Sequence, residues 1–299
     1  MWSIVDASAL KPSIEYLQQL RRTKNTKGVL VQWHRASDSK RPALVFIPGF
    51  LTAQAPNKPF EKWTSQITDL AKYYDMAAYG LYWPSAEIAD LLKGDAWTRT
   101  LCSFSTFSPS SLSVLSSSLL SPAVTAPILG LGVPTLLNAL KTWKKTVAYA
   151  DIIGKNPDSW LESFDRPVVV LGHSLGGRMA IHSAIHTKSS QLKQVYAMAP
   201  AVLPQNCHFE QISKSLHYKV GVLYSENDAI LKYLFRLAEM TRKAPLGLDG
   251  GPTECQDFLT CVDANYLHNR QIGHQDYSDC CLTSFKGGTL GMQFADLAH

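Results

Sequence analysis

The segment 168–185, VVVLGHSLGGRMAIHSAI, constrains the fold of this chain more than any other feature. It begins as a run of β-branched and apolar residues, which is typical of a buried strand, and it continues with the pattern of a helix. The two are joined by a Gly-x-Ser-x-Gly turn at 172–176. Gly172 and Gly176 let the strand and the helix approach closely, so Ser174 is held at the tip of a sharp, strained turn. Such a turn requires a sheet with helices packed against it.

The rest of the chain repeats the alternation of strand and helix. Apolar runs rich in β-branched residues predict strands at 28–34, 43–49, 76–83, 167–172, 194–200 and 219–225, with a weaker one at 258–264. Helical patterns occupy 60–74, 136–153, 178–187 and 229–240. Nearly continuous apolar strands that alternate with helices predict an α/β fold with a mostly parallel sheet covered on both faces. A chain of 299 residues is long enough to build this as one large domain.

The longest insertion between predicted elements is 84–140, before the strand that leads to the turn, and we interpret it as an apolar cap on a single domain of residues 1–299. Residues 100–140 carry no charge, and the four prolines among them would interrupt a straight membrane-spanning helix. We therefore expect a flap or hairpin that covers a pocket and makes peripheral membrane contact through 100–140. A disordered, serine-rich loop is the alternative.

Composition and charge exclude several classes of protein. Apolar residues make up 45% of the chain and charged residues 18%, which indicates a folded core and excludes disorder. The net charge of +5 is small and no dense basic block is present, so we expect no nucleic-acid partner. Asp6 interrupts the short apolar start and the positive charges follow it, so we expect no signal peptide and a cytoplasmic protein, at most peripheral to a membrane.

The six cysteines form no CxxC pair, and the chain holds no phosphate loop, dinucleotide fingerprint or cluster of metal ligands. We therefore expect no metal and no cofactor. Free thiols in a reducing compartment are the expected state of the cysteines. The alternative is a disulfide in the C-terminal group, which would join Cys255 or Cys261 to Cys280 or Cys281.

Ser174 is the candidate nucleophile, and it needs a base because a free hydroxyl is hardly ionised near neutral pH. In proteins built around this turn, the acid and then the histidine follow the serine along the chain. The acid is expected after the strand at 219–225, where Asp228 precedes an apolar helical run. Asp228 could also cap that helix, and Glu226 is the alternative acid.

Three histidines follow the acid, namely His268, His274 and His299. His274 lies in a loop after the last predicted strand, and Gly273 beside it allows a close approach, so we predict that His274 is the base. Its other interpretation is a surface loop histidine, and His268 is the alternative base. In a triad, Asp228 would fix the tautomer of His274 and stabilise its charged form.

An oxyanion hole needs two backbone N–H groups. One is expected from Leu175, directly after the nucleophile. The other is expected from Phe50 or Leu51, which follow the Pro-Gly turn at 48–49; a simple turn is the alternative interpretation. His173 is expected to pack beside the turn, because strand alternation directs it away from the active face.

Four segments together carry a resemblance to a known family: the turn segment above, VFIPGFL at 45–51, LYSENDAIL at 223–231 and IGHQDY at 272–277. They resemble the α/β-hydrolases and, more narrowly, domain of unknown function family 726, which includes relatives described as transmembrane and coiled-coil domain proteins. The resemblance runs from about 44 to 277. In larger relatives the region before the turn is apolar and membrane-associated, whereas this chain has no evident spanning pair and no coiled coil.

The resemblance implies an α/β-hydrolase fold with the triad Ser174, Asp228 and His274. The expected activity is that of a serine hydrolase that cleaves a carboxylic ester through an acyl-enzyme. A small-molecule or lipid ester is the expected partner, as in lipases, phospholipases and esterases. Two alternatives remain: a catalytically idle hydrolase fold that serves as an interaction module, and a toxin-like phospholipase effector.

Overall fold

A computed structural model describes the chain over residues 4–6, 29–50, 61–83, 85, 133–212, 214, 216–286 and 290. Most of the predicted cap, at 84 and 86–132, lies outside these ranges, as do Leu51 and His299. The assignment of one domain at 1–299 with a cap at 84–140 therefore stays a prediction.

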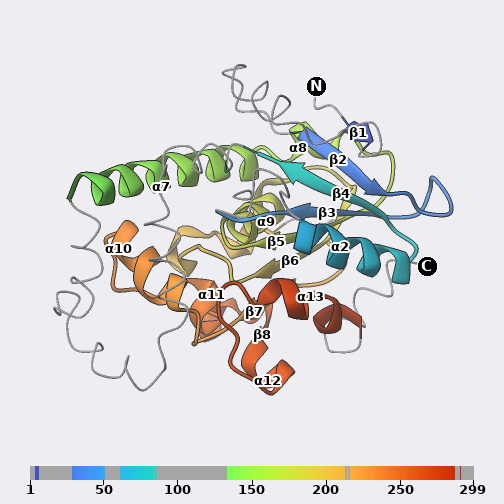
Figure 1. Ribbon diagram of the computed structural model, residues 1–299. Coiled ribbons are helices and arrows are strands. Elements are labelled where there is room, and N and C mark those ends of the chain that lie inside the picture. Colours follow the sequence, from blue (N-terminus) through green and yellow to red (C-terminus); the bar gives the residue numbers. More distant parts are fainter. Residues whose placement is uncertain are drawn as a thin grey trace.

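The described residues form an eight-stranded sheet in the order β1-β2-β4-β3-β5-β6-β7-β8 (Figure 1). Neighbouring strands are parallel except β2 and β4, which are antiparallel. The strands are β1 (Ile4–Asp6), β2 (Val29–His34), β3 (Ala43–Ile47), β4 (Ala77–Tyr82), β5 (Val168–His173), β6 (Leu192–Met198), β7 (Val220–Tyr224) and β8 (Leu259–Asp263). This arrangement is an α/β-hydrolase fold, as predicted.

The seven predicted strands are all present, with ends that differ by no more than two residues from the predicted ones. Every residue of β3 and β5 is buried, because helices cover both faces of the sheet there. The strand β1 was not predicted, since three residues are too few to show a periodic pattern.

Helices α2 and α13 pack together on one side of the sheet, and α7 packs against α9 on the other (Figure 1). The α-helices are α2 (Glu61–Tyr73), α7 (Val133–Gly154), α8 (Asp158–Leu161), α9 (Leu175–His186), α10 (Arg236–Ala238), α11 (Leu246–Asp249), α12 (Ala264–His268) and α13 (Tyr277–Lys286). Short 3₁₀ turns are η3 (Pro204–Asn206), η4 (Phe209–Gln211) and η6 (Thr253–Cys255). None of the helices within the described ranges combines the length and the apolar character that crossing a membrane would need.

The helix predicted at 229–240 differs from the observed structure. It begins as a π-helix, η5 (Ile230–Phe235), and continues directly as the short α10. Asp228 stands two residues before η5, and its carboxylate accepts a hydrogen bond from Leu231 N (2.9 Å). A π-helical turn is rare and is frequent beside functional sites. Periodicity alone does not separate the two, because both present a buried stripe.

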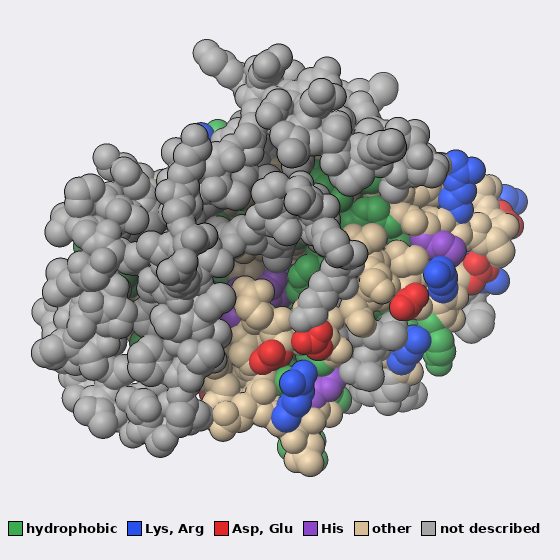
Figure 2. Space-filling model, in the orientation of Figure 1, with side chains coloured by type: hydrophobic (Ala, Val, Ile, Leu, Met, Phe, Trp, Pro, Cys, Tyr) green, Lys and Arg blue, Asp and Glu red, His purple; other side chains and the backbone are tan. Residues whose placement is uncertain are grey.

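On the face shown in Figure 2, basic and acidic side chains of the described residues are interspersed. The thiols of Cys207, Cys255 and Cys261 are free. The alternative disulfide in the C-terminal group, which needed Cys255 or Cys261 as one partner, is therefore absent. Burial raises the pKa of Cys207 and of Cys261 to about 12, so these thiols are not reactive thiolates at neutral pH.

A charged pair joins α7 to α9 directly behind the turn that carries Ser174. The Arg178 guanidinium donates to both carboxylate oxygens of Asp151, at 2.6 and 3.0 Å, and His182 Nε2 lies 3.3 Å from the same carboxylate. Burial alone would raise the pKa of Asp151, but the nearby His182 and Arg178 side chains outweigh it and hold the pKa below that of an ordinary aspartate. Arg178 is almost fully buried, so its positive charge is compensated by the Asp151 carboxylate and not by water.

Replacing Asp151 with alanine should lower the free energy of unfolding by about 3 kcal/mol, because it leaves the buried Arg178 charge without its partner. The loss should begin to shrink as the pH falls below about 4, because a carboxyl with a lowered pKa stabilises the fold fully above the unfolded pKa and loses this contribution gradually as the pH falls toward the folded one. Urea unfolding of both proteins at pH 7 and pH 3.5 measures this. Asp165→Ala, which removes an exposed partner of Arg166, is the control and should change little. An equal loss from both variants would contradict the prediction.

Candidate active site

Ser174 occupies a strained turn between β5 and α9. Its φ is 57° and its ψ is −117°, a backbone conformation that costs free energy for any residue with a side chain and that occurs mainly where function requires it. The turn is held by the backbone: Ser174 N donates to Met198 O (2.9 Å), and Ser174 O accepts from the N–H groups of Arg178 and Ala201 (3.1 Å each). The sheet and the helix therefore over-determine the position of this serine.

The two glycines of the turn stand where no side chain fits. A Cβ on Gly176 would lie 2.0 Å from Ile47 O, and one on Gly172 would lie 2.2 Å from Gly176 O. Both contacts are with backbone, which cannot move aside as a flexible side chain can. The strand β3, the turn and α9 therefore meet at van der Waals distance only because both positions are glycine.

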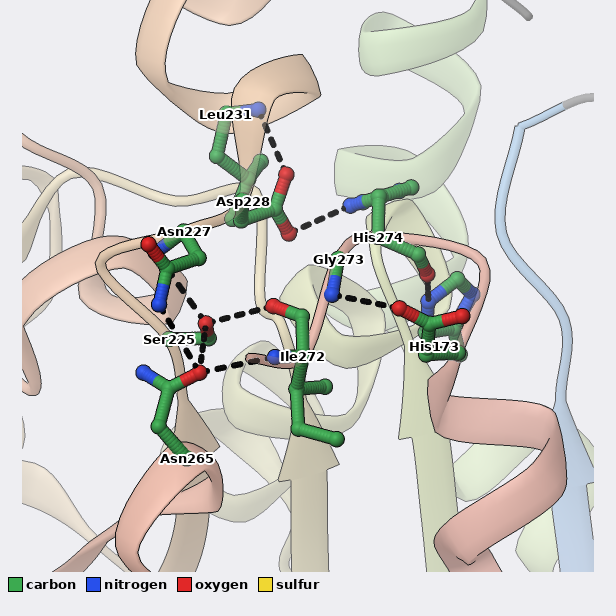
Figure 3. Close-up of polar contacts among 10 residues, drawn as sticks. His173, Ser225, Asn227, Asp228, Leu231, Asn265, Ile272, Gly273 and His274 are labelled. Carbon is green, nitrogen blue, oxygen red and sulfur yellow. Dashed lines mark hydrogen bonds and ion pairs between the residues drawn. The ribbon is translucent and has the colours of Figure 1, made fainter. Parts of the chain in front are cut away.

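Asp228 and His274 form a buried pair at the end of the sheet (Figure 3). His274 Nδ1 lies 2.7 Å from Asp228 Oδ2, and both side chains are almost completely buried. The other carboxylate oxygen accepts a hydrogen bond from Leu231 N in the first turn of η5. The Asp228 carboxylate can only accept a hydrogen bond, so it favours the tautomer with the proton on Nδ1. In that tautomer the Nε2 lone pair of His274 is able to take a proton.

The alternative acid and base stand elsewhere. Glu226 is exposed, and the ring of His268 lies against α13, with Nε2 2.9 Å from Ser284 Oγ. His299 lies outside the described residues. Of the acids and histidines considered from the sequence, the structure brings together Asp228 and His274.

His173 connects the serine turn to the histidine loop. Its Nε2 donates to His274 O (3.1 Å), and its ring lies 4.8 Å from the ring of His274 and 5.0 Å from that of Trp63. Because His173 directly precedes Ser174, this contact places His274 next to the turn. Burial lowers the pKa of His173 well below its usual value, with a further contribution from His274, so the ring is neutral. The hydrogen bond to the histidine loop was not predicted.

No hydrogen bond between Ser174 and His274 is found among the described residues. Hydrogen bonds of this kind are often long or misaligned without substrate and tighten when it binds. Ser174, Asp228 and His274 follow the carboxyl ends of the parallel strands β5, β7 and β8. In open parallel sheets, ligands bind at that edge.

The turn after β3 runs directly beside the serine. A Cβ on Gly49 would lie 2.6 Å from Ser174 Cβ, and the carbonyl of Pro48 accepts from the Trp83 indole (3.0 Å). The next residue, Phe50, packs its ring 5.1 Å from Trp143 of α7. Within the described part of the chain, neither the Phe50 N–H nor the N–H of Leu175 donates a hydrogen bond. These two amides are the ones predicted for the oxyanion hole, and Leu51 lies outside the described residues.

No group of three or more His, Cys, Asp or Glu side chains in the described residues could hold a metal ion.

Residues 38–267, more than half of the chain, match the family described as "Protein of unknown function (DUF726)". No curated protein matches the chain in sequence.

Three solved structures illustrate what the chain is similar to. One is LpqC, a poly(3-hydroxybutyrate) depolymerase from Bordetella parapertussis, with 16% identity, 90% of this chain and 88% of that chain covered, and a TM-score of 0.39. The esterase Pf2001 of Pyrococcus furiosus has 7% identity, 91% of each chain covered and a TM-score of 0.37. The α/β hydrolase domain-containing protein 10 from mouse has 12% identity, 88% and 94% covered, and a TM-score of 0.37.

Proposed function

The chain belongs to the DUF726 family, and we propose that it is a serine hydrolase that cleaves a carboxylic ester through an acyl-enzyme. The observation that carries the proposal is the buried hydrogen bond between His274 and Asp228, beside a serine on a strained turn. A carboxylate is costly to bury, and one that orients a histidine next to such a serine is the arrangement needed to activate a hydroxyl.

In the proposed reaction, Ser174 Oγ attacks the ester carbonyl while His274 Nε2 takes its proton. The N–H groups of Leu175 and of Phe50 stabilise the negative charge on the carbonyl oxygen, and Asp228 stabilises the imidazolium. The C–O bond to the leaving alkoxide then breaks, and His274 returns the proton to it. Water repeats the steps on the acyl-enzyme and releases the carboxylic acid, which restores Ser174.

We further propose that the substrate is a lipid or lipid-like ester. The uncharged residues 100–140 run into α7, which begins at Val133. Trp143 of α7 contacts Phe50, which follows the turn beside Ser174, and its ring centroid lies 6.2 Å from that of Phe235 of η5. Apolar groups on this side suit an acyl chain, and the uncharged segment suits a cap that contacts a lipid surface.

A fluorophosphonate probe tests the chemistry, because it labels only a serine activated as a nucleophile. The full-length protein should be labelled at Ser174, as located by mass spectrometry, and the heat-denatured protein should not be labelled. On p-nitrophenyl esters, kcat/KM should rise from the acetyl to the octanoyl chain. Absence of both labelling and hydrolysis would overturn the proposed function. Labelling with a preference for the acetyl ester would overturn only the lipid substrate.

A further inference from the structure

The loop that carries His274 is fixed by side chains of other elements. Ile272 uses both of its backbone polar groups: its N–H donates to Asn265 Oδ1 (2.8 Å), and its carbonyl accepts from Ser225 Oγ (2.5 Å). The carbonyl of His274 itself accepts from His173. The backbone is thus held two residues before the imidazole and again at it, so the ring has little freedom to turn away from Asp228.

The amide oxygen of Asn265 is the centre of this network (Figure 3). Besides Ile272 N it receives a hydrogen bond from Asn227 Nδ2 (3.1 Å), and Ser225 Oγ lies 3.0 Å from it. Asn227 directly precedes Asp228, and its N–H donates to Ser225 Oγ (3.1 Å). One side-chain oxygen on α12 therefore joins the loop of the acid to the loop of the base.

Asn265 is itself well fixed. Its N–H donates to Asp263 Oδ1 (2.8 Å), which caps the start of α12. Its amide nitrogen Nδ2 is buried and has no hydrogen-bond partner among the described residues, so the contacts that define its orientation are all made by the oxygen. An acceptor at this position is what the two loops use.

We propose that Asn265 is a positioning residue for the proposed triad: its amide oxygen holds the loops of Asp228 and His274 in register. This inference rests on the proposed function. It explains why a polar side chain stands here with an unpaired buried N–H, a feature that lowers stability and that a purely structural contact would have no reason to keep.

Two substitutions at Asn265 separate the acceptor from the shape. Asn265→Leu keeps the volume and removes the acceptor; Asn265→Asp keeps an oxygen for all the donors. We expect kcat to fall about 10- to 100-fold in Asn265→Leu with little change in KM, because small displacements of reacting groups are costly. Asn265→Asp, measured on the high-pH plateau of its own profile, should retain most of kcat. Tyr266→Ala, at an exposed neighbour on the same helix, is the control.

The Asp228–His274 hydrogen bond gives a second readout that needs no substrate. Its Nδ1 proton should give a low-field proton NMR resonance in the wild type, in Asn265→Asp and in Tyr266→Ala, and should be lost or exchange-broadened in Asn265→Leu. If Asn265→Leu does not fold, Ser225→Ala should show the same two losses. A folded Asn265→Leu with wild-type kcat and resonance would overturn the inference. A wild type that shows the resonance but no hydrolysis and no probe labelling would instead overturn the proposed function.

Discussion

Replacing Ser174 with alanine should lower kcat/KM for ester hydrolysis by about 10⁴-fold or more, because nucleophile, base and acid act as a unit. The loss should appear in kcat, since the apolar groups that bind the substrate remain. Steady-state kinetics with an octanoyl ester measures it. The matched control is Ser183→Ala. Ser183 is buried in α9, the helix that follows the turn, and its hydroxyl donates to Met179 O (2.9 Å), so this substitution should leave kcat almost unchanged.

The fold of the Ser174→Ala variant is expected to survive, because alanine has the same backbone penalty at a φ of 57° as serine. A glycine there has no such penalty, so Ser174→Gly should have a higher Tm than Ser174→Ala while being equally inactive. A variant without the Ser174 hydroxyl that keeps a tenth of the wild-type rate would show that the nucleophile is elsewhere.

The sequence was sufficient for the parts of this fold that are encoded locally. The strand before Ser174, the two glycines and the helix after it are contiguous, and each has a pattern that follows from sterics or burial. Asp228 follows β7, whose apolar run is evident, and His274 lies in a loop beyond the last strand; parallel strands bring such loops to one edge, so the two could be expected to lie close together. The predicted strand at 258–264 is weakly patterned since most side chains of β8 are only partly buried.

Contacts between distant loops could not be predicted. Asn265 meets Ser225 and Ile272, which stand 40 residues before it and 7 after it, and a single asparagine has no periodic pattern to mark it. The hydrogen bond of His173 was missed for a related reason: alternation predicts the face of the strand, and only the course of the loop decides what the ring reaches. The apposition of Phe50 and Trp143 likewise depends on packing between elements.

These long-range contacts converge on the position of one imidazole. The ring of His274 is hydrogen-bonded to Asp228, and its carbonyl accepts a hydrogen bond from His173. Two residues earlier, the backbone N–H of Ile272 donates to Asn265. A histidine that only filled space would need none of these, because apolar packing would suffice. The number of independent constraints therefore favours a hydrolase over an idle fold that serves as an interaction module.

Replacing Asp228 with asparagine should lower kcat/KM for ester hydrolysis about 10³- to 10⁴-fold. Asparagine has nearly the same shape, so the loop and the cap at Leu231 N are retained through its amide oxygen. The group that faces His274 Nδ1 can then be an N–H₂ donor, which favours the tautomer with the proton on Nε2. That tautomer cannot accept the proton of Ser174. Glu226→Gln, a matched neutralisation of an exposed carboxylate two residues away, should leave the rate nearly unchanged.

Thermal unfolding distinguishes a lost tautomer from a lost fold. Asp228→Asn should keep a Tm close to that of the wild type, because its amide oxygen can still accept the hydrogen bond from Leu231 N. Unfolding, in contrast, would lower the Tm and the rate together. If Glu226→Gln proved the more damaging change, Glu226 would be the acid. To reach the exposed Glu226, the ring of His274 would then have to turn away from Asp228 and give up the buried hydrogen bond between them.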